Sequence, residues 1–207
     1  MKVNWPERLW VNSPVRRIVQ QIEARFFSRL QSLPPDACCL EIGCGCGVGA
    51  RIIWKTFVPG AIHALDIDPA MLKKAQKKKS SRAAASLHLL GADAQALPFA
   101  DASFDAVFNY GIIHHLEDWR SGINEVGRVL RDRGAFYFEE IYPPLYANFL
   151  FRHILDHPRE DRFHGPEYKH ALHDAGLRLL DGYRESRFAI VGAARKLSEA
   201  KTPEVRP

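Results

Sequence analysis

The residues with the clearest chemical potential lie in one short stretch, C-C-L-E-I-G-C-G-C-G-V-G-A, from Cys38 to Ala50. A short apolar run ends at the acid Glu41, glycine then recurs at every second position, and a largely apolar segment follows as far as Phe57. Strand, glycine turn and helix in this order hold nucleotide-like ligands in doubly wound α/β folds, because glycines permit a tight turn and the helix start offers free N–H groups. The sequence therefore predicts a ligand-binding turn here.

Two classes of ligand fit this turn. Gly45, Gly47 and Ala50 satisfy the dinucleotide pattern G-x-G-x-x-G/A, and Asp66 follows Gly47 by 19 positions, near the ribose-binding spacing. Glu41 separates the two classes, because a phosphate-binding turn gains nothing from an anion just before its first glycine. A carboxylate there suits a ligand that carries an ammonium and no phosphate, such as S-adenosylmethionine. An NAD-dependent oxidoreductase is the alternative that the glycine pattern alone allows.

Further motifs then follow in a familiar order. E-I-G-C-G-C-G at 41–47, A-L-D-I-D-P-A-M-L at 64–72, G-A-D-A-Q-A-L-P-F at 91–99 and F-D-A-V-F-N-Y-G-I-I-H-H-L at 104–116 resemble the first four motifs of the class I S-adenosylmethionine-dependent methyltransferases. E-V-G-R-V-L-R-D-R-G at 125–134 resembles the helix and turn before the fifth strand, although the family commonly has K-P-G-G where this chain has R-D-R-G. The resemblance covers about residues 36–140 and is closest to the small-molecule branch (type 11) that includes the ubiquinone and menaquinone C-methyltransferases.

The resemblance implies a Rossmann-like, doubly wound α/β fold with a seven-stranded sheet, mostly parallel and completed by a C-terminal antiparallel hairpin. A chain of 207 residues, 46% apolar and 26% charged, suits a single domain of this kind. We expect an N-terminal arm and helix over 1–35, the methyltransferase domain over 36–196 with a lid-like insertion at 142–165, and a tail over 197–207. Ser13 and Pro14 predict the start of an amphipathic helix to Leu30, which either packs on the domain or forms a wall of the substrate pocket.

The resemblance also assigns the donor site. Asp66, at the tip of the second strand, would accept both ribose hydroxyls with its two oxygens, while Asp68 suits a helix cap better than a ligand contact. Asp93 would bind the adenine amino group, although such an aspartate can also be a turn residue. The donor is S-adenosyl-L-methionine and the product S-adenosyl-L-homocysteine. The expected cofactor-binding set is Glu41, Gly43, Cys44, Gly45, Asp66, Ile67 (against the adenine ring), Asp93, Ala94 (its N–H to a ring nitrogen) and Asn109 (its carbonyl to the methionyl ammonium).

Three residues are candidates on the acceptor side. His114 and His115 stand in I-H-H-L-E-D, where imidazole could act as a general base or serve the loop structurally. Tyr142 begins the aromatic-rich segment 142–157, which in this family often covers the acceptor; ordinary packing of a connecting helix is the alternative.

We therefore expect methyl transfer from S-adenosylmethionine to a small, hydrophobic or aromatic acceptor. A non-catalytic S-adenosylmethionine-binding protein and an RNA or protein methyltransferase are the alternatives. Methyltransferases that act on the amino groups of nucleic-acid bases carry N/D-P-P-Y/F at the end of strand four; this chain has N-Y-G-I from Asn109, which counts against base methylation.

The charge, the cysteines and the apolar runs of the chain limit the partners and the location that we expect. The net charge is +5, and much of the excess is one lysine run at 73–79 that suits a solvated helix, so there is no clear nucleic-acid signature. The four cysteines lie within 38–46 on a predicted strand and turn, which favours small buried thiols over a zinc site, and we expect no metal and a reducing, cytoplasmic location. No signal peptide or run of 18 apolar residues occurs, so we expect no transmembrane segment, which leaves room for peripheral membrane contact.

Overall fold

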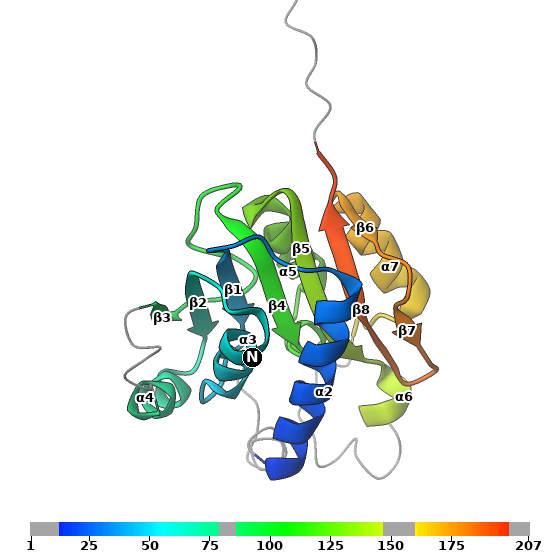
Figure 1. The fold of residues 1–207 in the computed structure, drawn as a ribbon. Helices are drawn as coiled ribbons and strands as arrows, with labels where there is room; N and C mark the ends of the chain where they lie inside the picture. The colour runs from blue at the N-terminus through cyan, green and yellow to red at the C-terminus, as the bar shows by residue number, and fades with distance from the viewer. Residues whose placement is uncertain (1–12, 79–85, 147–159, 199–207) are drawn as a thin grey trace, which may run out of the picture.

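The computed structural model describes residues 13–78, 86–146 and 160–198 (Figure 1). The arm at 1–12 and most of the segment expected to form a lid lie outside the described residues. In the described ranges, no helix has the length and apolar character needed to cross a bilayer. The elements are α2 (Pro14–Leu30), β1 (Cys38–Ile42), α3 (Val48–Phe57), β2 (Ala61–Asp66), α4 (Pro69–Lys77), β3 (Leu87–Gly91), β4 (Phe104–Tyr110), η1 (Ile113–His115), α5 (Trp119–Val129), β5 (Leu130–Ile141), α6 (Pro143–Tyr146), α7 (Gly165–Asp174), β6 (Leu177–Leu179), β7 (Arg184–Glu185) and β8 (Ala189–Lys196).

The strands form one sheet in the order β3-β2-β1-β4-β5-β8-β6. Neighbours from β3 to β5 pair in parallel, whereas β8 is antiparallel to both β5 and β6. This arrangement confirms the predicted doubly wound fold with its antiparallel C-terminal pair, and the two-residue β7, paired with β8, adds an eighth strand. The chain reverses its direction of winding between β1 and β4, and ligands bind at such switch points beyond the carboxyl ends of the strands.

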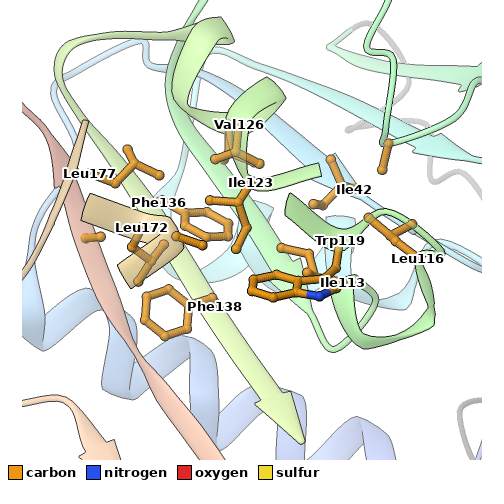
Figure 2. Close-up of a cluster of buried hydrophobic side chains, with 14 of the residues drawn as sticks. Ile42, Ile113, Leu116, Trp119, Ile123, Val126, Phe136, Phe138, Leu172 and Leu177 are labelled. Carbon is orange, nitrogen blue, oxygen red and sulfur yellow. The ribbon is translucent and has the colours of Figure 1, made fainter. Parts of the chain in front are cut away.

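Helices cover both faces of the sheet. On the face that is nearer in Figure 1, α2 and α3 pack on a buried cluster that includes Phe27 and Tyr137. On the opposite face, Trp119 of α5 packs with Phe136 and Phe138 (Figure 2). Residues of β5 therefore alternate between the two cores, as the two-residue period of a strand requires.

The predicted helix starts are present. Ser13 caps α2 by accepting the N–H of Arg16 at 3.1 Å, and Pro14 takes the first helical position. Asp68 caps α4 through the N–H of Ala70, so its expected role as a cap is confirmed. The exposed lysines of the described part of the run lie on and just after α4, as expected of a solvated helix.

The R-D-R-G segment differs from the prediction. We expect a helix to Leu130, a turn, and a strand from Ala135; instead α5 ends at Val129 and β5 begins at Leu130. Leu130 pairs with Phe104 and Ala135 pairs with Ala106, so the intervening residues form a bulge in which Arg133 has a φ of 63°. The segment expected to be a turn is therefore a bulge inside β5, because Leu130, which precedes it, is already paired with β4.

The thiols match their expected surroundings. Cys39, Cys44 and Cys46 are buried, Cys38 is partly buried, and all four are free. Burial raises the pKa of Cys38 above its ordinary value, so this thiol is held in its neutral form at neutral pH.

Candidate functional site

The glycine turn after β1 has the backbone conformation that only glycine adopts freely. Gly43, Gly45 and Gly47 have φ values of 69°, 52° and 75°, and Gly47 is the residue that precedes α3. A Cβ atom on Gly43 would lie 2.3 Å from Cγ2 of Ile112, so the turn also packs closely against the segment after β4. The turn is therefore held closely against the segment that follows β4.

A cavity opens at this turn, beyond the carboxyl ends of β1, β2 and β4. It contains about 1090 Å³ of empty space, including the part open to solvent. Its lining combines the glycine turn, the ends of β2 and β4, the loop after β3, and one face of α2. The lining residues are Arg16, Gln20, Glu41, Gly43, Cys44, Gly45, Cys46, Val48, Gly49, Leu65, Asp66, Ile67, Asp68, Met71, Ala92, Asp93, Ala94, Tyr110, Gly111, Ile112, His115 and Leu116.

Most of the expected site residues meet in this cavity. Asn109, His114 and Tyr142 are not among the lining residues. The side chains of Asn109 and His114 are buried and contact Glu140, and the Tyr142 hydroxyl donates to Glu185 at 3.2 Å. The roles assigned to all twelve residues stay predictions. Those that line the cavity are Glu41, Gly43, Cys44, Gly45, Asp66, Ile67, Asp93, Ala94 and His115.

Glu41 is a buried carboxyl group at the base of the cavity. It is 2% exposed, and within the described chain its Oε2 has no hydrogen-bond partner. Burial, and then the neighbouring charge of Asp66, raise the pKa of Glu41 to about 8, although the Ala50 N–H opposes the shift. A carboxyl group in this state can accept a cationic hydrogen-bond donor from the cavity.

Asp66 is held by the backbone on both sides. Its Oδ2 accepts the N–H of Gly45 at 2.8 Å, and its Oδ1 accepts the N–H of Asp68 at the same distance. These bonds orient the carboxylate at the rim of the turn, and a carboxylate oxygen can accept more than one hydrogen bond. Asp93 is similarly oriented, since its Oδ1 accepts the N–H of Gln95 at 2.9 Å.

Helix α2 contributes a wall that our sequence reasoning left open. Arg16 is buried, and its guanidinium donates to Glu23 Oε1 at 2.8 Å, to Glu139 Oε2 at 2.9 Å and to the carbonyl of Tyr110 at 3.1 Å. Burial, and then repulsion from Glu139, raise the pKa of Glu23 to about 7, although Arg16 opposes the shift. The detectable signal was a charged pair, Arg16 and Glu23, seven positions apart on the inner face of an amphipathic helix.

A second network lies on the other side of β5. Glu140 accepts the Asn109 Nδ2 at 2.5 Å and the Ile113 N–H at 2.8 Å, and its Oε2 lies 2.5 Å from His114 Nδ1. Burial raises the pKa of Glu140 to about 7 although these hydrogen bonds oppose it. Burial also lowers the pKa of His114 well below its ordinary value, with the neighbouring His115 adding to the shift. His114 is thus a neutral ring engaged with Glu140.

Several polar atoms face the cavity without a protein partner. Among the described residues, Gln20 Oε1, Glu41 Oε2 and the Tyr110 hydroxyl are buried and make no hydrogen bond. Buried polar groups are normally paired, so these atoms indicate a ligand with polar groups at this end of the cavity.

Comparison with known proteins agrees with this geometry. Residues 40–138 match the family model for a methyltransferase domain. A fatty-acid O-methyltransferase of Mycolicibacterium smegmatis is 32% identical over 161 residues, which are 78% of this chain and 51% of that protein. A malonyl-acyl-carrier-protein O-methyltransferase of Legionella pneumophila is 32% identical over 130 residues, 62% of this chain and 45% of that protein. The chain therefore spans about half the length of the curated relatives it matches.

A solved structure is similar in fold. The S-adenosylmethionine-dependent methyltransferase from Aquifex aeolicus superposes with a TM-score of 0.70 over 95% of this chain and 100% of that one, at 16% identity. At this identity the likeness concerns the fold alone.

Proposed function

We propose, on the premise that residues 40–138 are a methyltransferase domain, that the protein transfers a methyl group from S-adenosylmethionine to a small hydrophobic acceptor. The observation that carries this proposal is the buried carboxyl of Glu41, which faces the cavity with an unpartnered oxygen beside Asp66. The two acids at this turn favour a cationic ligand, because Glu41 can ionise against a bound cation, and the negative charge of Asp66 opposes a pyrophosphate. The same observation counts against the dinucleotide alternative.

The residues around the cavity fit S-adenosylmethionine. Glu41, with Gln20 and Tyr110 nearby, would hold the aminoacyl end, which carries an ammonium group. Asp66 would bind the ribose hydroxyls, and Ile67, 43% exposed, offers an apolar surface for the adenine. The bound cofactor supplies a methyl group already activated on a sulfonium. The protein therefore has to align an acceptor and exclude water.

For the acceptor we propose a lipid-like acid. One relative is named for fatty acids and another for malonyl-acyl-carrier protein, and both names specify transfer to oxygen. A carboxylate is ionised at neutral pH, so its oxygen can attack without a general base. This agrees with a His114 ring that is held by Glu140 and does not line the cavity. His115, which does line it, would contact the acceptor.

Calorimetry with S-adenosylhomocysteine tests the donor site. We expect binding by the wild type and a loss of at least about tenfold in affinity for Asp66→Ala, because the ribose contacts and the orientation of the turn are both lost. Asp101→Ala, which removes an exposed partner of Arg128, is the control and should bind normally. Equal binding by Asp66→Ala and the wild type would exclude Asp66 from the site, and binding of NAD alone would reject the proposal.

A second experiment separates catalysis from binding. The protein is incubated with methyl-labelled S-adenosylmethionine and a series of fatty acids, and mass spectrometry is used to detect labelled methyl esters. Ester formation supports the proposed acceptor. Donor binding without any methylated product from these acids, or from a wider extract of metabolites, would favour a non-catalytic S-adenosylmethionine-binding protein.

A further inference from the structure

Helix α2 exposes apolar side chains where a surface helix usually carries polar ones. Val15, Ile18 and Ile22 are 55%, 57% and 60% exposed and recur at helical spacing along one stripe. The opposite face of α2 is already buried, with Phe27 in the core and Arg16 at the cavity. This outer stripe therefore has no packing role within the described part of the protein.

Toward the C-terminal end of α2, positively charged side chains continue the line of the apolar stripe. Arg25 and Arg29 follow Ile22 at the same spacing, and both are exposed. The one acid of α2, Glu23, is turned inward and paired with Arg16. The outer side of the helix thus combines a row of branched apolar residues with cations and carries no exposed acid.

The neighbouring helix α3 adds positive charge to the same face of the protein. α3 packs beside α2 on the same face of the sheet (Figure 1), and it carries Arg51 and Lys55 with no acidic residue. The face formed by these two helices is therefore basic around the apolar stripe. A surface of this kind is complementary to an anionic lipid interface, where apolar side chains enter the acyl boundary and basic ones meet the headgroups.

We propose that α2 docks the protein on an anionic membrane surface, with Val15, Ile18 and Ile22 inserted and Arg25 and Arg29 on lipid phosphates. The inner face of the same helix lines the cavity, through Arg16 and Gln20, so docking would bring the cavity to the lipids. Binding of a nucleic acid is less favoured, because phosphate contacts would leave the apolar row exposed to water. The proposal does not depend on methyl transfer.

Vesicle co-sedimentation of the full chain tests the proposal. Vesicles of equal parts phosphatidylcholine and phosphatidylglycerol should bind the wild type, and vesicles of phosphatidylcholine alone should bind it more weakly. Ile18→Gln with Ile22→Gln should lower partitioning at least about tenfold, since insertion scales with apolar area. Arg25→Gln with Arg29→Gln should lower it about tenfold or more on the anionic vesicles, and added salt should mimic that change.

Two matched controls locate the effect. Val58 is 71% exposed but lies at the end of α3, so Val58→Gln should bind like the wild type. Lys73→Gln with Lys74→Gln removes equal charge from α4 and should change partitioning by less than about twofold. Binding of S-adenosylhomocysteine by every variant reports that the fold and donor site are intact.

Three results would overturn the proposal. The first is a wild type that does not bind anionic vesicles while it binds S-adenosylhomocysteine. The second is equal vesicle binding by the Ile18→Gln, Ile22→Gln variant and the wild type. The third is a wild type that is a dimer by light scattering and an Ile18→Gln, Ile22→Gln variant that is a monomer. That result would assign the stripe to contact with a second copy of the chain.

Discussion

Glu41 and Gly49 meet where the first helix after the glycine turn begins. A Cβ atom on residue 49 would lie 1.8 Å from Glu41 Oε1, which leaves no space for any side chain. The Ala50 N–H, one residue further on, donates to the same carboxyl group. Gly49 is not part of the dinucleotide pattern, and its function here is to admit a buried acid beneath the helix.

Gly49→Ala should therefore displace Glu41. We expect a loss of about 1–3 kcal/mol in the free energy of unfolding, as for overpacked cores, and a weaker affinity for S-adenosylhomocysteine. Chemical denaturation and calorimetry measure the two effects. Gly91→Ala is the control, because its Cβ would meet only Leu72 Cδ1 at an ordinary 3.6 Å. An unchanged ligand affinity in Gly49→Ala would contradict the role given to Glu41.

Ligand binding should release a proton from Glu41. Its pKa is about 8 without ligand, so the carboxyl is mostly protonated at pH 7, and a bound ammonium favours the ionised form. The affinity for S-adenosylhomocysteine should therefore fall as pH is lowered from 8 to 6. Calorimetry in two buffers of different ionisation enthalpy counts the proton. Glu41→Gln should bind without this release, and the same proton count in both proteins would refute the assignment.

Arg16→Met should destabilise the protein strongly. It leaves Glu23 and Glu139 buried without their cation, and breaking a buried ion pair costs on the order of 3–5 kcal/mol. The loss should be smaller at pH 6 than at pH 8, because Glu23, with a pKa already near 7, can take up a proton at the lower pH. Arg120→Met, which removes an exposed pair with Asp161, should cost at most about 1 kcal/mol. Equal costs for the two variants would show that the Arg16 network does not stabilise the fold.

Glu140 should make stability depend on pH with a definite sign. Its pKa is about 7 in the folded protein, against an ordinary value of 4.5 expected in the unfolded chain, so the native state holds more protons between these two pH values. The free energy of unfolding should fall as pH rises from 4.5 to 7, by on the order of a few kcal/mol from this group. Urea denaturation of Glu140→Gln should show a correspondingly shallower fall.

Glu125 provides the control of opposite sign. Its side-chain bonds to Arg128 lower its pKa, so the stability it contributes is present above pH 4.5 and is lost as pH falls. Glu125→Gln should therefore leave the slope between pH 4.5 and 7 unchanged. A slope that is the same in Glu140→Gln and the wild type would contradict the proton uptake assigned to Glu140.

Site residues could be predicted from the sequence at positions where the backbone conformation or the ligand permits few residue types. The glycine turn needs positive φ values, and carboxylates at the end of β2 and just after β3 lie at the same edge of a parallel sheet. Glu41, Gly45 and Asp66 were predicted for these reasons, Asp93 was added by the family resemblance, and all four line one cavity. The fold was predicted because the ordered motifs resemble those of the methyltransferase family, and that resemblance implies a doubly wound sheet.

Contacts between segments that are far apart in the sequence could not be predicted. Helical periodicity gave the bounds of α2, but not its rotation on the sheet, which places Arg16 between Glu23 and Glu139. The alternation of β5 sends Glu139 to one face and Glu140 to the other, which required the register of the strand. The bulge at R-D-R-G arises from pairing with Phe104, a residue some 26 positions earlier in the chain.

The hydrogen bonds of Arg16 also limit how far the protein can be shortened while it keeps its ligand-binding site. The segment that matches the methyltransferase family ends at residue 138, yet Arg16 ties α2 to the carbonyl of Tyr110 and to Glu139. A fragment trimmed to that segment would lose one side of its ligand chamber, and β8 could no longer shield the flank of β5. The ligand-binding unit is therefore larger than its recognisable motifs, and any excised or grafted version must carry the first helix and the closing strands with it.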